Sequence, residues 1–376
     1  MEFSFLVPTK IHFGTRALEF LVEDLEKAGY GRIGLVFDNN LADHALLLAL
    51  RERLGQRCTL VESPVTFAEP TYKLLDTYRQ AFMASGIEAV VGVGGGSTLD
   101  TAKAVAVLVN NKQPAIAYRG FDKMTEPVLP VYAVPTTAGT GSEITPNASF
   151  VDDDVNKKLG INGEAIRPKG AYLHPGFIAT CPEKPATYAA IDALVHAVEA
   201  FAAQKATPMA RLLAREAITR VLDNIVAAVK DKNMAAIENV FMGSLLAGMA
   251  MMHSGTGPAA ALSYPLGVHL KVPHGLAGGI FLPQLMRWNV ERGYDGYADL
   301  MATTGIDKKA QATMVVEKFS AAWKLLQVPA KASQVGLKES DLPHFLTDLQ
   351  DLRGAIDQNP IPITDDDLHD ILSVHL

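Results

Sequence analysis

The sequence is poor in cysteine, in long apolar runs and in positive charge. Its two cysteines, Cys58 and Cys181, lie far apart in a chain of 376 residues, which excludes a disulfide framework and favours a reducing cytoplasm. No run reaches the roughly 18 apolar residues of a membrane-spanning helix, and residues 1–10 lack the basic and apolar segments of a signal peptide. The 34 basic and 41 acidic residues give a net charge of −7, which argues against a nucleic-acid or anionic-membrane partner. We therefore expect a soluble, cytoplasmic protein.

Strand and helix signals alternate through the first half of the chain. Short apolar runs at 33–37, 89–93 and 131–134 are typical of buried strands, and amphipathic segments at 42–54 and 72–85 are typical of helices. This alternation predicts a parallel sheet covered by helices on both faces, with ligands at the carboxyl ends of its strands.

The pattern changes near residue 180. The segment Cys181–Pro185 contains two prolines and is interpreted as a connector, after which strand signals almost vanish. Thr207-Pro208 has the form of a helix cap and first turn, and Thr364–Asp367 has the spacing of a capping box. We predict an α/β domain over residues 1–180 and an all-helical domain over residues 181–376.

A glycine cluster, Gly92–Ser97, follows the second of these strands and precedes a predicted helix at 98–109. Glycines let the backbone approach a ligand closely, and the N–H groups at a helix N-terminus bind phosphate oxygens. Ser97 stands where a dinucleotide-binding fingerprint has its third glycine, so a tight strand-to-helix turn is the alternative. Asp100 and Lys103 follow on this helix, either on its solvated surface or in the site.

Two further features favour nucleotide recognition. The loop Pro135–Glu143 is rich in small hydroxyl residues that can donate to a phosphate or a ribose, although an ordinary polar turn has the same composition. Asp38 ends the first predicted strand, where a carboxylate accepts hydrogen bonds from a ribose 2′-hydroxyl and repels the 2′-phosphate of NADP. Asp38 therefore favours NAD, the alternative being an ordinary turn residue.

Candidate metal ligands lie in the second half. Asp192 and His196 stand at i and i+4 of an apolar helical segment and share one face of it. They must pair with each other or bind something, because burying a lone charge is costly. His274, between Pro273 and Gly275, is a third candidate, unless it is an ordinary loop residue. One carboxylate with imidazoles suits Fe²⁺ or Zn²⁺.

These segments together resemble the iron-containing (group III) alcohol dehydrogenase family. The matching stretches are Gly94–Ser97 with Asp100 and Lys103, then Pro135–Glu143, Asp192–Glu199 and Pro265–Gly275, with Asn359-Pro360 before the final helix. The resemblance covers essentially the whole chain.

The resemblance implies a Rossmann-like N-terminal domain and a helical C-terminal domain. It also implies an active-site cleft between them that holds NAD(P) and a divalent metal, and a homo-oligomer, a dimer in this family. The cofactor contacts that it implies are Asp38, Gly95, Gly96, Ser97, Asp100, Thr136, Thr137, Thr140, Ser142 and Lys158.

One position departs from the family pattern. Members typically bind the metal through one aspartate and three histidines, and here Asp192, His196 and His274 match. The remaining ligand is expected fourteen residues before His274, where this chain has Ala260. A second histidine, linked to proton transfer in many members, is replaced by Tyr264.

Three interpretations of this departure remain open. In the first interpretation, Asp192, His196 and His274 are enough to bind the metal, since catalytic zinc commonly uses three protein ligands and an open position. Alternatively, His253 or His269 acts as a surrogate ligand. In the third interpretation the chain is a diverged member that binds metal weakly or not at all.

The predicted function is that of an NAD(P)-dependent alcohol dehydrogenase or aldehyde reductase, with NADP the less favoured cofactor. The metal acts as a Lewis acid on the oxygen of a small alcohol or carbonyl substrate. His274 is counted as catalytic as well as a ligand, and Tyr264 or a bound water supplies the proton in reduction.

Two other functions remain open as interpretations of the sequence. One is a dehydroquinate-synthase-like lyase that uses NAD transiently, for which only Lys271 and Arg287 supply basic groups near the ligand motifs. The other is a nucleotide-binding protein with a decayed metal site.

Overall fold

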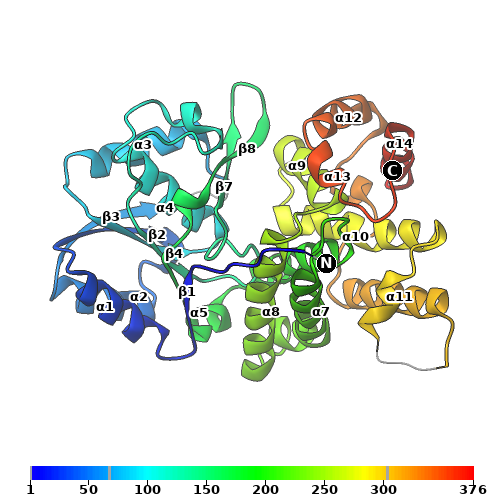
Figure 1. Cartoon of the computed structure of the whole chain (residues 1–376), viewed down its shortest axis with the longest axis horizontal. Coiled ribbons are helices and arrows are strands. Elements are labelled where there is room, and N and C mark those ends of the chain that lie inside the picture. The colour runs from blue at the N-terminus through cyan, green and yellow to red at the C-terminus, as the bar shows by residue number, and fades with distance from the viewer. Residues whose placement is uncertain (1, 67–68, 302–304) are drawn as a thin grey trace. The chain divides into compact units, whose positions relative to one another are not determined.

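A computed structural model describes residues 2–66, 69–301 and 305–376 (Figure 1). The chain divides into two compact units. One, the α/β unit, is formed by Leu6–Cys181, and the other, the helical unit, by Pro182–Leu376 with the N-terminal residues up to Phe5. All strands within the described residues lie in the α/β unit. The predicted fold class, a parallel-sheet domain followed by an all-helical one, is confirmed.

A six-stranded parallel sheet forms the centre of the α/β unit, in the order β1-β9-β6-β4-β2-β3. The chain moves outward from β2 to β3 and then crosses back to β4, so the strand order reverses between β2 and β4. Ligands of such sheets bind at this reversal, beyond the carboxyl ends of the strands. The six strands are β1 (Lys10–Phe13), β2 (Arg32–Asp38), β3 (Thr59–Val65), β4 (Ala89–Gly94), β6 (Val131–Pro135) and β9 (Gly170–Leu173), and a smaller sheet contains β5 (Gly120–Phe121), β7 (Asn147–Asp152) and β8 (Lys157–Asn162).

Helices cover both faces of the sheet, as predicted (Figure 1). Successive residues of a strand point to opposite faces, so Leu35 of β2 packs beneath one layer of helices and Val36 beneath the other. The glycine turn after β4 leads directly into its helix, which therefore begins at Gly96, two residues before the predicted start. One layer contains α1 (Ala17–Ala28), α2 (Ala45–Gly55) and α5 (Pro175–Thr180), and the other contains α3 (Tyr72–Met83) and α4 (Gly96–Leu108).

The first helix of the helical unit, α6, begins at Glu183, inside the segment predicted as a connector. Pro185 lies in the first turn of α6 and not in a connector, because proline is tolerated where the N–H groups have no helical partner. The predicted caps are confirmed: Thr207 caps α7 with Pro208 at its first position, and Thr364 and Asp367 form the capping box of α14. The helices are α6 (Glu183–Ala202), α7 (Pro208–Val229), α8 (Met234–Met252), α9 (Pro258–Leu270), α10 (His274–Glu291), α11 (Lys308–Leu325), α12 (Leu342–Gln350), α13 (Arg353–Ile356) and α14 (Asp365–Val374).

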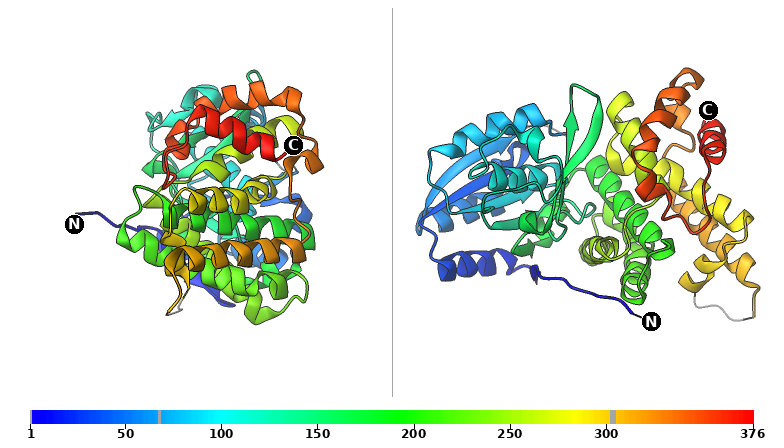
Figure 2. Two further views of the ribbon diagram at one scale, coloured as in Figure 1. Left: turned by 90° about the vertical axis from the view of Figure 1, so that its right-hand side faces the viewer. Right: turned by 45° about the horizontal axis from the view of Figure 1, so that its top comes forward.

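Among the described helices, α8 alone is long and apolar enough to cross a membrane, with a mean hydropathy of 1.4. More than half of that apolar stretch is buried within the protein. It packs along α7 and α6, and Figure 2 shows α7 and α8 side by side. Its apolar composition is that of a core helix.

Helix α10 packs against α6 through glycines. A side chain at Gly275 would overlap the backbone carbonyl of Tyr188, and one at Gly279 would overlap Ile191. Only glycine at these positions allows the two helix backbones to approach so closely. The contact places His274, the first residue of α10, beside Asp192 of α6.

The first prediction concerns this contact. Replacing Gly275 with alanine is expected to lower the free energy of unfolding by about 1–3 kcal/mol, because α10 must move away from a rigid backbone carbonyl. The matched control is Gly278→Ala, whose new Cβ would lie 3.4 Å from the methyl groups of Val195. Since alanine also favours helix, this control should change stability by less than about 1 kcal/mol. Urea unfolding measures the free energy of unfolding of both variants. An equal decrease in the two variants would refute the role of Gly275 in the close packing of α10 on α6.

Candidate functional site

The glycine turn and the threonine-rich loop face each other at the end of β4. Gly95 is the N-cap of α4 and Gly96 its first residue. A Cβ on Gly95 would lie 3.2 Å from Oγ1 of Thr137, and one on Gly96 would lie 2.6 Å from Cγ2 of Thr140. These glycines thus let the threonine-rich loop pack directly against a helix N-terminus, where N–H groups and the helix dipole attract phosphate. The arrangement fits the pyrophosphate of a dinucleotide.

Asp38 lies at the carboxyl end of β2, beside β4, where Phe37 pairs with Val93. Its Oδ1 accepts hydrogen bonds from the backbone N–H of Asn40 at 2.9 Å and from the Asn40 side-chain amide at 3.0 Å. Asp38 therefore makes the contacts of a turn residue while it stands at the edge where the adenosine ribose is expected. Its contact with a ribose stays a prediction.

Asp100 and Lys103 hold protein groups. Oδ1 of Asp100 accepts from the Ser142 hydroxyl at 2.6 Å, and Oδ2 accepts from the backbone N–H of Ser149 at 2.8 Å. Nζ of Lys103 donates to the carbonyls of Thr145 at 3.0 Å and Asn147 at 2.7 Å. Lys103 is fully buried, so its surface interpretation is wrong, and burial lowers its pKa to about 8. Both side chains fasten the loop after β6 to α4.

The other predicted cofactor residues are placed as follows. Thr136 continues the pairing of β6, since its N–H donates to the Gly94 carbonyl at 3.0 Å. Ser97 is the second residue of α4, at the helix N-terminus. Lys158 lies on β8, where its ammonium is 2.8 Å from a carboxylate oxygen of Glu69.

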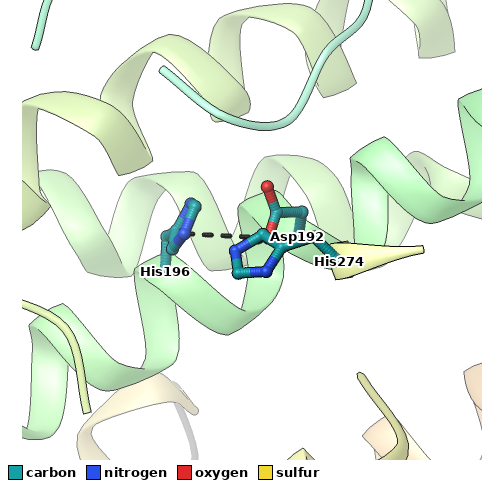
Figure 3. Close-up of side chains that lie close together, drawn as sticks. All are labelled: Asp192, His196 and His274. Atoms are coloured by element: carbon teal, nitrogen blue, oxygen red, sulfur yellow. Dashed lines mark ion pairs between the residues drawn. The ribbon is translucent and has the colours of Figure 1, made fainter. Parts of the chain in front are cut away.

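Three candidate ligands converge in the helical unit (Figure 3). Asp192 and His196 come from α6 and His274 from the start of α10, and one ligand atom of each lies within 4.8 Å of the others. Nε2 of His196 and Nε2 of His274 are each 3.7 Å from the same atom, Oδ1 of Asp192. This separation exceeds a hydrogen bond, so direct pairing does not satisfy these groups.

The same distances suit a shared cation. Metal–ligand bonds of about 2.0–2.2 Å at tetrahedral angles hold two ligand atoms ~3.4 Å apart. Nδ1 of His196 is buried and makes no hydrogen bond with any described residue. Its other ring nitrogen, Nε2, is the one that lies 3.7 Å from Oδ1 of Asp192. The donor set, one carboxylate and two imidazoles, therefore fits a divalent metal such as Zn²⁺ or Fe²⁺.

A buried glutamate, which the sequence analysis did not single out, anchors the neighbouring helix. Glu199 follows His196 on the same buried stretch of α6, and its carboxylate accepts the backbone N–H groups of Gly257, Ala259 and Ala260 at 2.7, 2.5 and 3.2 Å. These groups open α9. Burial raises the pKa of Glu199 to about 7, against the effect of the three N–H groups. In the sequence, its position one turn after His196 could have indicated that Glu199 shares the buried face of this helix.

Helix α9 carries three side chains of interest. Ala260 and Tyr264 are one turn apart and share a helix face. The Tyr264 ring meets the His274 ring edge-on, with centroids 5.4 Å apart. Ser263, which sequence reasoning missed, places its hydroxyl 2.8 Å from Nδ1 of His274. No short motif marks such a serine, because its partner lies on another helix.

Neither proposed surrogate histidine joins the three ligands within the described residues. The His253 ring packs against Phe5 at a centroid distance of 4.3 Å, with the two rings tilted by 33°. Nε2 of His269 lies 2.7 Å from a carboxylate oxygen of Asp348. These contacts favour the interpretation in which Asp192, His196 and His274 suffice.

Two family models cover most of the chain. The model of iron-containing alcohol dehydrogenases matches residues 8–175, and that of the C-terminal domain of the same family matches residues 186–376. Lactaldehyde reductase of Escherichia coli K12 is 27% identical over 88% of both chains.

Solved structures show the same architecture. A 1,3-propanediol oxidoreductase superposes with a TM-score of 0.93 at 26% identity, covering both chains completely. Sulfoacetaldehyde reductase from Bifidobacterium kashiwanohense, solved with NAD⁺, has a TM-score of 0.90 at 25% identity, covering 100% of this chain and 99% of that one. The chain therefore belongs to the iron-containing alcohol dehydrogenase family and is an oxidoreductase that acts on alcohols or aldehydes.

Proposed function

We propose that this protein is an NAD-dependent alcohol dehydrogenase and aldehyde reductase for short-chain substrates, with a metal held by Asp192, His196 and His274. The observation that carries the proposal is the position of two imidazole nitrogens at equal distances, 3.7 Å, from one carboxylate oxygen. When bound, the metal supplies a Lewis acid for the substrate oxygen and the nicotinamide supplies or accepts the hydride.

Each residue near the metal has a separate task. The Asp192 carboxylate offsets part of the metal charge, while His196 and His274 bind as neutral donors. In reduction, the Tyr264 hydroxyl or a bound water donates a proton to the substrate oxygen. The edge-on contact with His274 supports this role, because it keeps the Tyr264 ring beside a ligand.

The α/β unit holds the cofactor. The backbone N–H groups at the start of α4 bind the pyrophosphate, and Thr137 and Thr140 pack beside this helix start. Asp38 accepts hydrogen bonds from the adenosine ribose. The NAD⁺ in the structure of the related sulfoacetaldehyde reductase supports this choice of cofactor.

The names of the relatives support a small substrate. They include lactaldehyde reductase and 1,3-propanediol oxidoreductase, both named for short oxygen-bearing compounds. A lyase of the dehydroquinate-synthase type requires a basic cluster for an acidic substrate. Of the basic residues nearest the ligand motifs, Arg287 is paired with Glu317 at 2.9 Å, and no observation favours that alternative.

The second prediction concerns cofactor choice. The dissociation constant for NADH should be lower than that for NADPH, because the Asp38 carboxylate repels a 2′-phosphate. Asp38→Ser, which keeps a hydrogen-bond acceptor for the turn, should narrow the difference by weakening NADH binding and strengthening NADPH binding. Fluorescence titration of both cofactors measures this. Tighter binding of NADPH by the unmutated protein would rule out the assignment of Asp38.

The third prediction concerns the vacant ligand position. Ala260→His should lower the dissociation constant for Zn²⁺ at least ~10-fold and raise turnover, because a neutral imidazole is a strong zinc ligand. The unmutated protein should lose its metal readily to a chelator. Metal content after dialysis against a chelator series and NADH turnover are the measurements. Ala260→Phe is the matched control, since it fills similar space without a ligand atom.

Two results would count against the metal-assisted mechanism. One is full NADH turnover by protein that holds no metal, which would assign the chemistry to hydrogen-bond donors such as Tyr264. The other result is loss of the metal in His253→Ala or His269→Ala, together with unchanged metal retention and turnover in Ala260→His. This result would show that one of these histidines is a surrogate ligand.

A further inference from the structure

We propose that Ser263 is a positioning residue that holds the neutral His274 ring in its Nδ1–H form, so that Nε2 is the nitrogen that this histidine presents toward Asp192 for metal binding. The inference rests on the proposed metal site and goes beyond it, because it assigns a role to a side chain outside the ligand set.

The geometry consists of two short hydrogen bonds to one hydroxyl. Oγ of Ser263 lies 2.6 Å from the backbone carbonyl oxygen of Ala260 and 2.8 Å from Nδ1 of His274. Ser263 is 1% exposed, so water does not compete for these bonds. Nε2 of the same ring points to Oδ1 of Asp192.

Proton counting decides the direction of the bonds. A carbonyl oxygen only accepts, so the single hydroxyl hydrogen of Ser263 must be donated to Ala260. The hydroxyl oxygen then accepts from His274, which requires the proton of the neutral ring to sit on Nδ1. Nε2 is left without a proton, in the form that binds a metal.

The Ala260 carbonyl, which accepts a hydrogen bond from the Ser263 hydroxyl, is itself held in place. The N–H groups of Ala259 and Ala260 donate to Glu199 of α6, the helix that also carries Asp192 and His196. The Ala260 carbonyl therefore has a fixed position relative to the ligands of α6. Helix α9 transmits that position through Ser263 to His274 on α10.

This arrangement matters because the candidate site offers few imidazoles. With alanine at position 260, two imidazoles are found at the site among the residues that the structure describes. A hydrogen-bonded partner on the second nitrogen fixes the orientation of a ligand histidine, and removing such a partner typically costs about 10–100-fold in metal affinity.

The experiment compares the ring protonation of His274 by ¹⁵N NMR of histidine-labelled, metal-free, full-length protein at a pH well above 7. The His274 signal is identified by its absence from a His274→Gln variant. We expect the Nδ1–H form in the unmutated protein and loss of this preference in Ser263→Ala. Ser263→Thr, which retains the hydroxyl, should restore it. A ring protonated on Nε2 in the unmutated protein, or an unchanged Nδ1–H form in Ser263→Ala, would overturn the proposal.

Zinc affinity is the second measurement. Ser263→Ala should weaken Zn²⁺ binding about 10–100-fold. The matched control is Ser320→Ala, which removes from α11 a hydroxyl that donates to the Val316 carbonyl at 3.0 Å and contacts no ligand. Zinc binding equal in Ser263→Ala and Ser320→Ala would overturn the inference. Failure of the unmutated protein to bind zinc would refute the proposed metal site instead, while the NMR comparison would still decide the role of Ser263.

Discussion

The buried carboxylate of Asp192 is the constraint around which the helical unit is arranged. A charge that is 4% exposed needs a compensating partner, and both groups that face it are imidazoles too distant for hydrogen bonds. Bringing the second imidazole there requires α10 to lie against α6 without intervening side chains, which Gly275 and Gly279 permit. Helix α9 completes the arrangement, because Glu199 holds its first turn against α6.

The sequence predicted the parts of the site that lie within one element. Asp192 and His196 were recognisable because four residues separate two neighbours on a helix face, and the glycine cluster because it joins a strand to a helix. The strands at β2, β4 and β6 were equally clear, since each is a short apolar run bounded by turn residues. Asp38 was found for the same reason, as the residue that ends β2.

The contacts between elements could not be predicted from local patterns. Ser263 and His274 belong to different helices, and only the packing of α9 on α10 shows that their side chains meet. Lys103 was equally ambiguous, because a lysine on a helix is usually solvated and only the loop folded over α4 buries it. The sequence offered His274 as a third candidate ligand and the family resemblance matched it, while the structure explained how close packing of glycines brings it beside Asp192.

The buried hydrogen bonds of Asp100 and Lys103 have a consequence for cofactor recognition. They link α4 to Ser142, Thr145, Asn147 and Ser149, so protein groups alone hold the loop that faces the glycine turn. The entropy lost in ordering this loop is therefore lost during folding and does not oppose association. In the proposed function the cofactor meets a preorganised surface, and its affinity depends in part on Asp100 and Lys103, whose hydrogen bonds are to protein groups.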